Sequence, residues 1–401
     1  MKISNLFFLL IAFTLTSTVF AQTKPTQTTS VSPNASPTPT TDILRTVYQG
    51  KMMQAAGISI QVQNEINAAA KLMQDGKFEE SIAAYTLVIK NHPNIMIAYN
   101  NRGYSYMQSG KPDLAIADFN IALKLSPTSM TYNNRGMAFL NKGDTTNALA
   151  DLSKAILLNP QDSLGYNNRS MVYNRLGDFN SALADQTKAL SILPKEAKFL
   201  ANRCFIYVKL KMTEQALKDC NDAIGLNPKS ALAYGNRGAA YLQISSFESA
   251  LKDYEMAIQI DDTIADFHFT RGYLLSNFGR YEEAIESFSK YINIHPTALG
   301  YLQRAAAYAK LNRSELELSD YDKAIEIEPS NFLAYNSRGI YYLKNKNINA
   351  ALKDLNKAIE LNPANITLYQ NRAYLYKQIG ETEKAAADEK TVKTLIAPPN
   401  N

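Results

Sequence analysis

An arginine recurs every 33 or 34 residues through most of this 401-residue chain, and this repeat limits the possible folds more than any other feature. Nine positions carry it: Arg102, Arg135, Arg169, Arg203, Arg237, Arg271, Arg304, Arg338 and Arg372. A closing proline follows the same period from Pro93 to Pro363, with Asp262 in place of one proline. A chain that repeats in this way is expected to stack similar units rather than to form two or three globular domains.

Each unit has the pattern of two helices that fold back on each other. Tyr99 and Gly103 are four residues apart and share one face of a first helix, and Ala115 and Phe119 do the same on a second helix. Residues 110–112, with the sequence Gly-Lys-Pro, separate the two helices. Because one hairpin cannot bury both apolar faces, neighbouring hairpins are expected to stack into an all-α solenoid.

Ten such units account for residues 62–399. Their starts are expected near residues 62, 96, 129, 163, 197, 231, 265, 298, 332 and 366, and the first unit lacks the arginine. Residues 42–61 carry apolar side chains at roughly helical spacing, and we expect them to form an N-terminal capping helical segment. Residues 22–41 are rich in Thr, Ser and Pro and are expected to be a disordered linker, because they cannot bury enough apolar surface to fold.

The N-terminus has the pattern of an export signal. Lys2 precedes the apolar run Leu6–Leu15, and Val19 and Ala21 are small residues at the positions that a signal peptidase requires. We therefore expect residues 1–21 to be a cleaved signal peptide and the protein to be exported, into a bacterial periplasm or out of the cell. An uncleaved N-terminal anchor is the alternative, and association with a membrane is expected only in that case.

Composition argues against several classes of function. The 42 Lys and Arg against 37 Asp and Glu are scattered and form no basic stripe, so nucleic acid is not an expected partner. Three His and two Cys lack metal-ligand spacing, and the sequence contains no phosphate-binding glycine loop and no convergent catalytic group. We therefore expect no metal, no cofactor and no enzymatic activity.

The repeating unit resembles the tetratricopeptide repeat family. The shared signature is an aromatic residue, a small residue, a second aromatic, a turn glycine, an alanine and a closing proline. The resemblance implies a right-handed superhelical α-solenoid of about ten helix-turn-helix hairpins, whose first helices line a concave groove. Two columns depart from the family: Tyr99 and its equivalents stand where Trp is usual, and Arg102 and its equivalents stand where Leu is usual.

An acidic partner accompanies almost every arginine. Sixteen residues after eight of the nine arginines stands an aspartate, and Ser287 follows the ninth. Since both members of a pair are almost equally far from the hairpin turn, facing helices bring them to the same height, and we expect structural ion pairs. These pairs are Arg102–Asp118, Arg135–Asp151, Arg169–Asp185, Arg203–Asp219 and Arg237–Asp253, followed by those of Asp320, Asp354 and Asp388. The alternative is that the arginines bind an anionic ligand.

The residue before the arginine is repeatedly asparagine, and the family resemblance places this column on the concave face. It is similar to the asparagine ladder of protein O-GlcNAc transferase, whose amides hold the backbone of a peptide. The predicted peptide-binding residues are Asn101, Asn134, Asn168, Asn202 and Asn236, with apolar contacts from Tyr104, Met137, Met171 and Phe205. The asparagines could instead bond neighbouring helices, and the apolar side chains could pack between units.

Two cysteines, Cys204 and Cys220, fall on facing helices of one unit, where they form either a disulfide or a pair of buried thiols.

The sequence as a whole favours an exported protein–protein interaction scaffold that binds a peptide or helix of another protein in its concave groove. The polar final helix has the character of a terminal cap, which favours a monomer. The alternative is a structural component that assembles with itself, or with an envelope complex, through its ends or convex face.

Overall fold

The computed structural model describes residues 57–396, which form twenty α-helices and no strand within that range. The predicted signal peptide and linker, and most of the predicted capping segment, lie outside the described residues. The first described helix begins at Ile60, where the Ser59 side chain accepts a hydrogen bond from the Val62 backbone amide and so caps the helix. None of the helices between residues 57 and 396 has both the length and the apolar character needed to cross a membrane.

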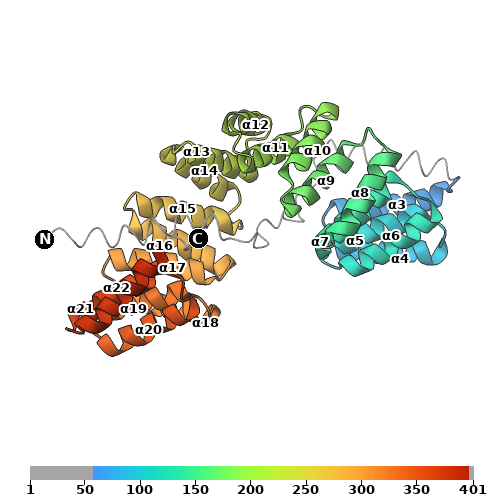
Figure 1. The fold of residues 1–401 in the computed structure, drawn as a ribbon. Coiled ribbons are helices and arrows are strands. Elements are labelled where there is room, and N and C mark those ends of the chain that lie inside the picture. Colours follow the sequence, from blue (N-terminus) through green and yellow to red (C-terminus); the bar gives the residue numbers. More distant parts are fainter. Residues whose placement is uncertain (1–56, 397–401) are drawn as a thin grey trace, which may run out of the picture. The chain divides into compact units, whose positions relative to one another are not determined.

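The helices pair as antiparallel hairpins (Figure 1). They divide into two compact units, with the boundary between Lys195 and Glu196. The first unit contains α3 (Ile60–Gln74), α4 (Phe78–Asn91), α5 (Met96–Gln108), α6 (Pro112–Leu125), α7 (Ser129–Lys142), α8 (Thr145–Leu158), α9 (Ser163–Leu176) and α10 (Phe179–Ile192). The second contains α11 (Ala197–Lys209), α12 (Thr213–Leu226), α13 (Ala231–Gln243), α14 (Phe247–Ile260), α15 (Ala265–Asn277), α16 (Tyr281–Ile294), α17 (Ala298–Lys310), α18 (Ser314–Ile327), α19 (Phe332–Lys344), α20 (Ile348–Leu361), α21 (Ile366–Gln378) and α22 (Thr382–Ile396). The predicted all-α fold of stacked hairpins is confirmed.

A left-handed backbone residue ends each first helix and turns the chain into the second. After α7, Gly143 has a φ of 84°, and the Asp144 amide donates back to the Phe139 carbonyl. Glycine adopts this conformation without a steric penalty, but Lys211 adopts it with a φ of 58°. Ser245 and Lys346 do the same in later hairpins, as does Asn312, whose residue type tolerates this conformation, so the turn forms even where the side chain disfavours it.

Within a hairpin, the small residue after the arginine lets the two helices approach closely. A Cβ added to Gly103 would lie 2.8 Å from the Phe119 ring, which is itself fully buried. Cys204 and Cys220 occupy these same two positions in α11 and α12, with their Cα atoms 5.5 Å apart, and their sulfurs are joined in a disulfide. The disulfide therefore takes the place of close contacts such as those of Gly103 with Phe119 and of Gly136 with Leu152 in other hairpins.

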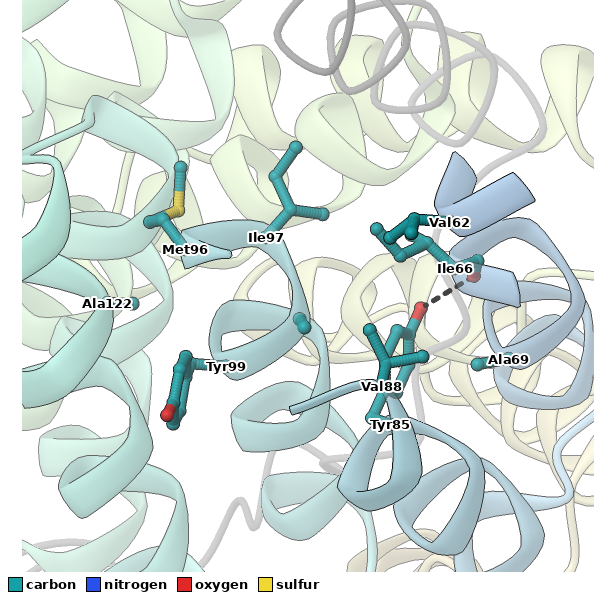
Figure 2. Close-up of a cluster of buried hydrophobic side chains, with 10 residues drawn as sticks. Val62, Ile66, Ala69, Tyr85, Val88, Met96, Ile97, Tyr99 and Ala122 are labelled. Atoms are coloured by element: carbon teal, nitrogen blue, oxygen red, sulfur yellow. Dashed lines mark hydrogen bonds between the residues drawn. The ribbon is translucent and has the colours of Figure 1, made fainter. Parts of the chain in front are cut away.

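The first hairpin closes its own core against the next helix. Val62 and Ile66 on α3 pack with Tyr85 and Val88 on α4, and Ile97 on α5 joins the same cluster (Figure 2). The Tyr85 hydroxyl also donates to the Ile66 carbonyl at 3.4 Å, so its one polar atom is satisfied inside this cluster. The hairpin of α3 and α4 therefore buries the face of α5 that points toward it.

Candidate functional site

The repeated arginines bind their predicted aspartates through two hydrogen bonds. Arg102 Nε lies 2.7 Å from Asp118 Oδ2, and its Nη2 lies 2.8 Å from Oδ1. The aspartate side chains of these eight pairs are 3–9% exposed. The same two-bond pair forms at Arg135–Asp151, Arg169–Asp185, Arg203–Asp219, Arg237–Asp253, Arg304–Asp320, Arg338–Asp354 and Arg372–Asp388. The hydrogen bond to Asp118 raises the pKa of Arg102 above its ordinary value, as expected for a charge-assisted pair.

The guanidinium also reaches a third helix, a contact that sequence reasoning missed. Arg102 Nη1 donates to Thr86 Oγ1 at 3.1 Å, and Arg169 Nη1 donates to Ser153 Oγ at 3.1 Å. Each acceptor lies on the second helix of the preceding hairpin, so one side chain joins its own two helices to a neighbour. The same contact reaches Asn120, Asn221, Ser289, Asp322 and Asn356 from the arginines of the following hairpins.

Two aromatic rings flank most of these guanidinium groups. The Arg102 Cζ atom lies 5.7 Å from the Tyr99 ring centre and 5.8 Å from that of Tyr106. Arg135, Arg169, Arg237, Arg304, Arg338 and Arg372 have the same arrangement, whereas Arg203 has one ring, that of Tyr207. Such contacts are favourable when the cation is partly desolvated. The unusual tyrosine and arginine columns therefore belong together as one packing unit.

The structure corrects the expectation that Asn101 and Asn134 face a groove as free amides. Asn101 is fully buried and donates to the Tyr85 hydroxyl at 3.0 Å. Asn134 is 7% exposed and donates to Asn100 Oδ1 of the preceding hairpin at 3.1 Å. The position before the arginine lies at the seam between successive first helices, where a buried amide must find its partner within the protein. These two residues therefore join neighbouring repeats.

The later asparagines follow the same pattern with more exposure. Asn168 is partly exposed and donates to Asn133 Oδ1 at 3.0 Å, and Asn236, also partly exposed, donates to the Ala201 carbonyl at 3.0 Å. Asn202 is partly exposed as well. The amide donors of Asn168 and Asn236 are thus already engaged, while their side chains keep some contact with solvent.

The predicted apolar contact residues lie partly buried on the first helices. Met137 on α7 and Met171 on α9 pack one side against a cluster that contains Leu152. Tyr104 on α5 is partly exposed, and so is Phe205 on α11, whose ring lies 5.1 Å from the Lys209 ammonium. Each of these side chains therefore contributes to packing and also presents some surface.

A buried carboxyl group stands where eight hairpins have alanine. Glu317 on α18 is 4% exposed and takes the position of Ala115 and its equivalents. Its Oε1 accepts a hydrogen bond from the Tyr321 hydroxyl at 3.3 Å, while its buried Oε2 has no partner among residues 57–396. Burial raises the pKa of Glu317, against the opposing effects of the Lys344 charge and the Tyr321 hydrogen bond. Its position in the alanine column was visible in the sequence and had not been recognised.

Metal ligands do not gather in the described part of the chain. Across residues 57–396, no group of three or more His, Cys, Asp or Glu side chains has a geometry that could hold a metal ion. His268 is 4% exposed, and its Nε2 lies 2.9 Å from the Asp262 carbonyl.

Comparison with known families identifies the repeat. Models described as "Tetratricopeptide repeat" match residues 97–129, 131–162, 165–196, 231–263, 265–297, 298–331, 332–365 and 355–387, which together make up more than half of the chain. The chain therefore belongs to the tetratricopeptide repeat family. Repeats of this kind build extended surfaces that bind other proteins, which supports a protein–protein interaction scaffold.

Several solved structures resemble this one. PilF of Pseudomonas aeruginosa is 18% identical with a TM-score of 0.47, over 54% of this chain and 96% of PilF. A tetratricopeptide repeat protein from Parabacteroides merdae is 23% identical with a TM-score of 0.43, over 64% and 98%. YrrB, described as having an unusual peptide-binding site, is 24% identical with a TM-score of 0.38, over 47% and 97%. No curated protein sequence matches the chain significantly.

The Arg169–Asp185 pair gives a direct test of the structural role of the arginine column. Replacing Arg169→Leu should lower the free energy of unfolding by about 3 kcal/mol, because it leaves the Asp185 carboxylate buried without its partner. Adding Asp185→Leu should restore part of this loss. Urea titration followed by circular dichroism measures both effects. A double variant no more stable than Arg169→Leu would contradict the pairing.

Glu317 predicts a specific dependence of stability on pH. Because its pKa is raised in the folded state, the folded protein keeps a proton that the unfolded chain releases. The stability that this proton contributes is present below the ordinary glutamate pKa and is lost as the pH rises through the raised value. The variant Glu317→Gln should therefore become more stable relative to the parent as the pH rises from about 4 to about 7.

Urea unfolding of both proteins at several pH values measures this difference. The exposed Glu315→Gln on the same helix is the matched control for the loss of one negative charge. A difference between parent and Glu317→Gln that stays constant with pH would contradict the account of Glu317.

Proposed function

We propose that this protein is an exported scaffold that binds a segment of another protein on the face formed by its first helices. The observation that carries the proposal is a repeated apolar surface in the unit that begins at Glu196. Leu232 on α13, five residues before Arg237, is 40% exposed, and Tyr374 on α21, in the same column as Tyr104 and Phe205, is 47% exposed. Partly exposed Phe205, Tyr273 and Ile340 belong to the same set. Apolar and aromatic side chains repeated along one face suit an extended or helical partner segment.

The asparagines have a smaller part in this proposal than the sequence predicted. Asn236 has committed its amide nitrogen to the Ala201 carbonyl, but its Oδ1 accepts no hydrogen bond within residues 57–396. That oxygen is positioned to accept from a backbone N–H of a bound segment. Apolar contacts would then supply most of the affinity, and partly exposed amides would align the partner.

Export has two independent supports. The apolar run Leu6–Leu15, followed by Val19 and Ala21, has the pattern of a cleaved signal. The second support is the Cys204–Cys220 disulfide, since disulfides persist in oxidising compartments such as the periplasm or the cell exterior. We also propose a monomer, because α22 buries only Ala385 and Asp388 and exposes polar residues elsewhere, as a terminal cap does.

Site-specific photo-crosslinking in cells tests the proposed surface. A benzophenone residue placed at Leu232 should form an adduct with a partner protein, while one placed at the exposed Lys252 on α14 should not. The variant Leu232→Asp should weaken binding of the captured partner about tenfold, because a charge is costly to bury against an apolar segment.

Lys252→Asp is the matched control, and it should leave that affinity unchanged. Equal labelling from the two positions would contradict the proposed surface. Adducts that contain only a second copy of this chain would favour self-assembly instead.

A further inference from the structure

Arg271 lacks two of the contacts that hold most of the other repeated arginines, the aspartate and the flanking aromatic rings. Ser287 stands where they have an aspartate. His268 and Leu275 stand where most of them have the two flanking aromatic rings, and among the described residues no ring contact to Arg271 is formed. One hairpin therefore keeps the arginine of the repeat without its aspartate and rings, while Glu255 on the preceding α14 stands where Asp322 contacts Arg338.

The donors of Arg271 are largely unused. Its Nη1 donates to Ser287 Oγ at 2.5 Å, whereas Nε and Nη2 make no hydrogen bond within residues 57–396. Those two nitrogens hold the aspartate oxygens in the other eight hairpins. The nearest carboxylate, Glu255 Oε1, lies 3.6 Å from Nε, and the Glu255 side chain is 42% exposed. This longer contact leaves the guanidinium able to bind a better acceptor.

Arg271 also lines a pocket of about 400 Å³. The pocket lies between three helices: Glu255 and Ile258 come from α14, His268 from α15, and Ser287 and Lys290 from α16. Lys290 supplies a second positive charge in the same lining. The Arg271 side chain is 19% exposed, so its position is sheltered and still accessible from solvent.

We propose that this pocket binds a carboxylate group, which takes the place that an aspartate side chain fills in the other hairpins. The Nε and Nη2 atoms of Arg271 donate to its two oxygens, and Lys290 adds a second cation to the site. The eight internal ion pairs support this proposal, because in each of them the equivalent arginine binds a carboxylate group on the facing helix.

The acidic residues of the pocket select against more highly charged anions. Glu255, Asp262 and Glu286 also line it, so every anion meets some repulsion there, and a phosphate or a polyanion meets more of it than a single carboxylate does. Two kinds of ligand can supply the carboxylate to this pocket: a small carboxylic acid, or another protein through a glutamate side chain. The pocket shares no residue with the proposed protein-binding surface, so the two proposals stand independently.

The substitution Ser287→Asp gives the sharpest test, because it makes this hairpin like its neighbours. The added aspartate should form the ninth ion pair, fill the site with the protein's own carboxylate and raise the melting temperature. Acetate and the peptide acetyl-Ala-Glu-Ala-Glu-Ala-amide are the two probes, titrated calorimetrically into the full-length chain at constant ionic strength. The corresponding Gln peptide is the control for the Glu peptide.

We expect at least one probe to bind the parent, and to bind Ser287→Asp and Arg271→Gln about tenfold more weakly or not at all. Ser319→Asp, which adds the same charge at an exposed position on α18, should bind like the parent. Acetate binding alone identifies a small acid, and Glu-peptide binding alone identifies a protein side chain. No binding of either probe by the parent, or equal binding by Ser287→Asp, overturns the proposal.

Discussion

The ion pair between a first-helix arginine and a second-helix aspartate is the interaction on which the rest of this solenoid depends. Each aspartate is almost fully buried, so its charge is tolerated only because two guanidinium nitrogens bind it. The same guanidinium reaches the preceding hairpin and lies between tyrosine rings. One side chain thus connects three helices, and its repetition couples neighbouring repeats, as is needed in a solenoid whose repeats contact only their neighbours.

The asparagines that directly precede the arginines also connect neighbouring repeats. Amides that could have held a peptide instead bond across successive first helices, as Asn134 does to Asn100. The face proposed to bind a partner is therefore mainly apolar, with Leu232 and Tyr374 as the most exposed of the residues named for it. Binding on such a face would add many weak contacts along the repeats, whereas the pocket proposed at Arg271 is a single polar site between α14, α15 and α16.

Sequence alone was sufficient for the all-α fold, because the arginine and proline periods leave no other way to bury the apolar faces. It also predicted Asp118 as the partner of Arg102, because two residues equally far from the turn of an antiparallel hairpin lie opposite each other on the two helices. Sequence could not tell which amides are buried, because Asn101 lies on a seam whose depth depends on how closely the helices approach. The choice between thiols and a disulfide at Cys204 depended on that same distance.

Native-state hydrogen exchange of the parent protein tests the central claim most directly. If the ion pairs set the local stability of each hairpin, the amides of α15 and α16 should exchange faster than those of α13, α14, α17 and α18, because of these three hairpins only the one with Arg271 lacks its aspartate. Equal or greater protection in α15 and α16 would contradict it, and would assign the stability of the repeats to apolar packing instead.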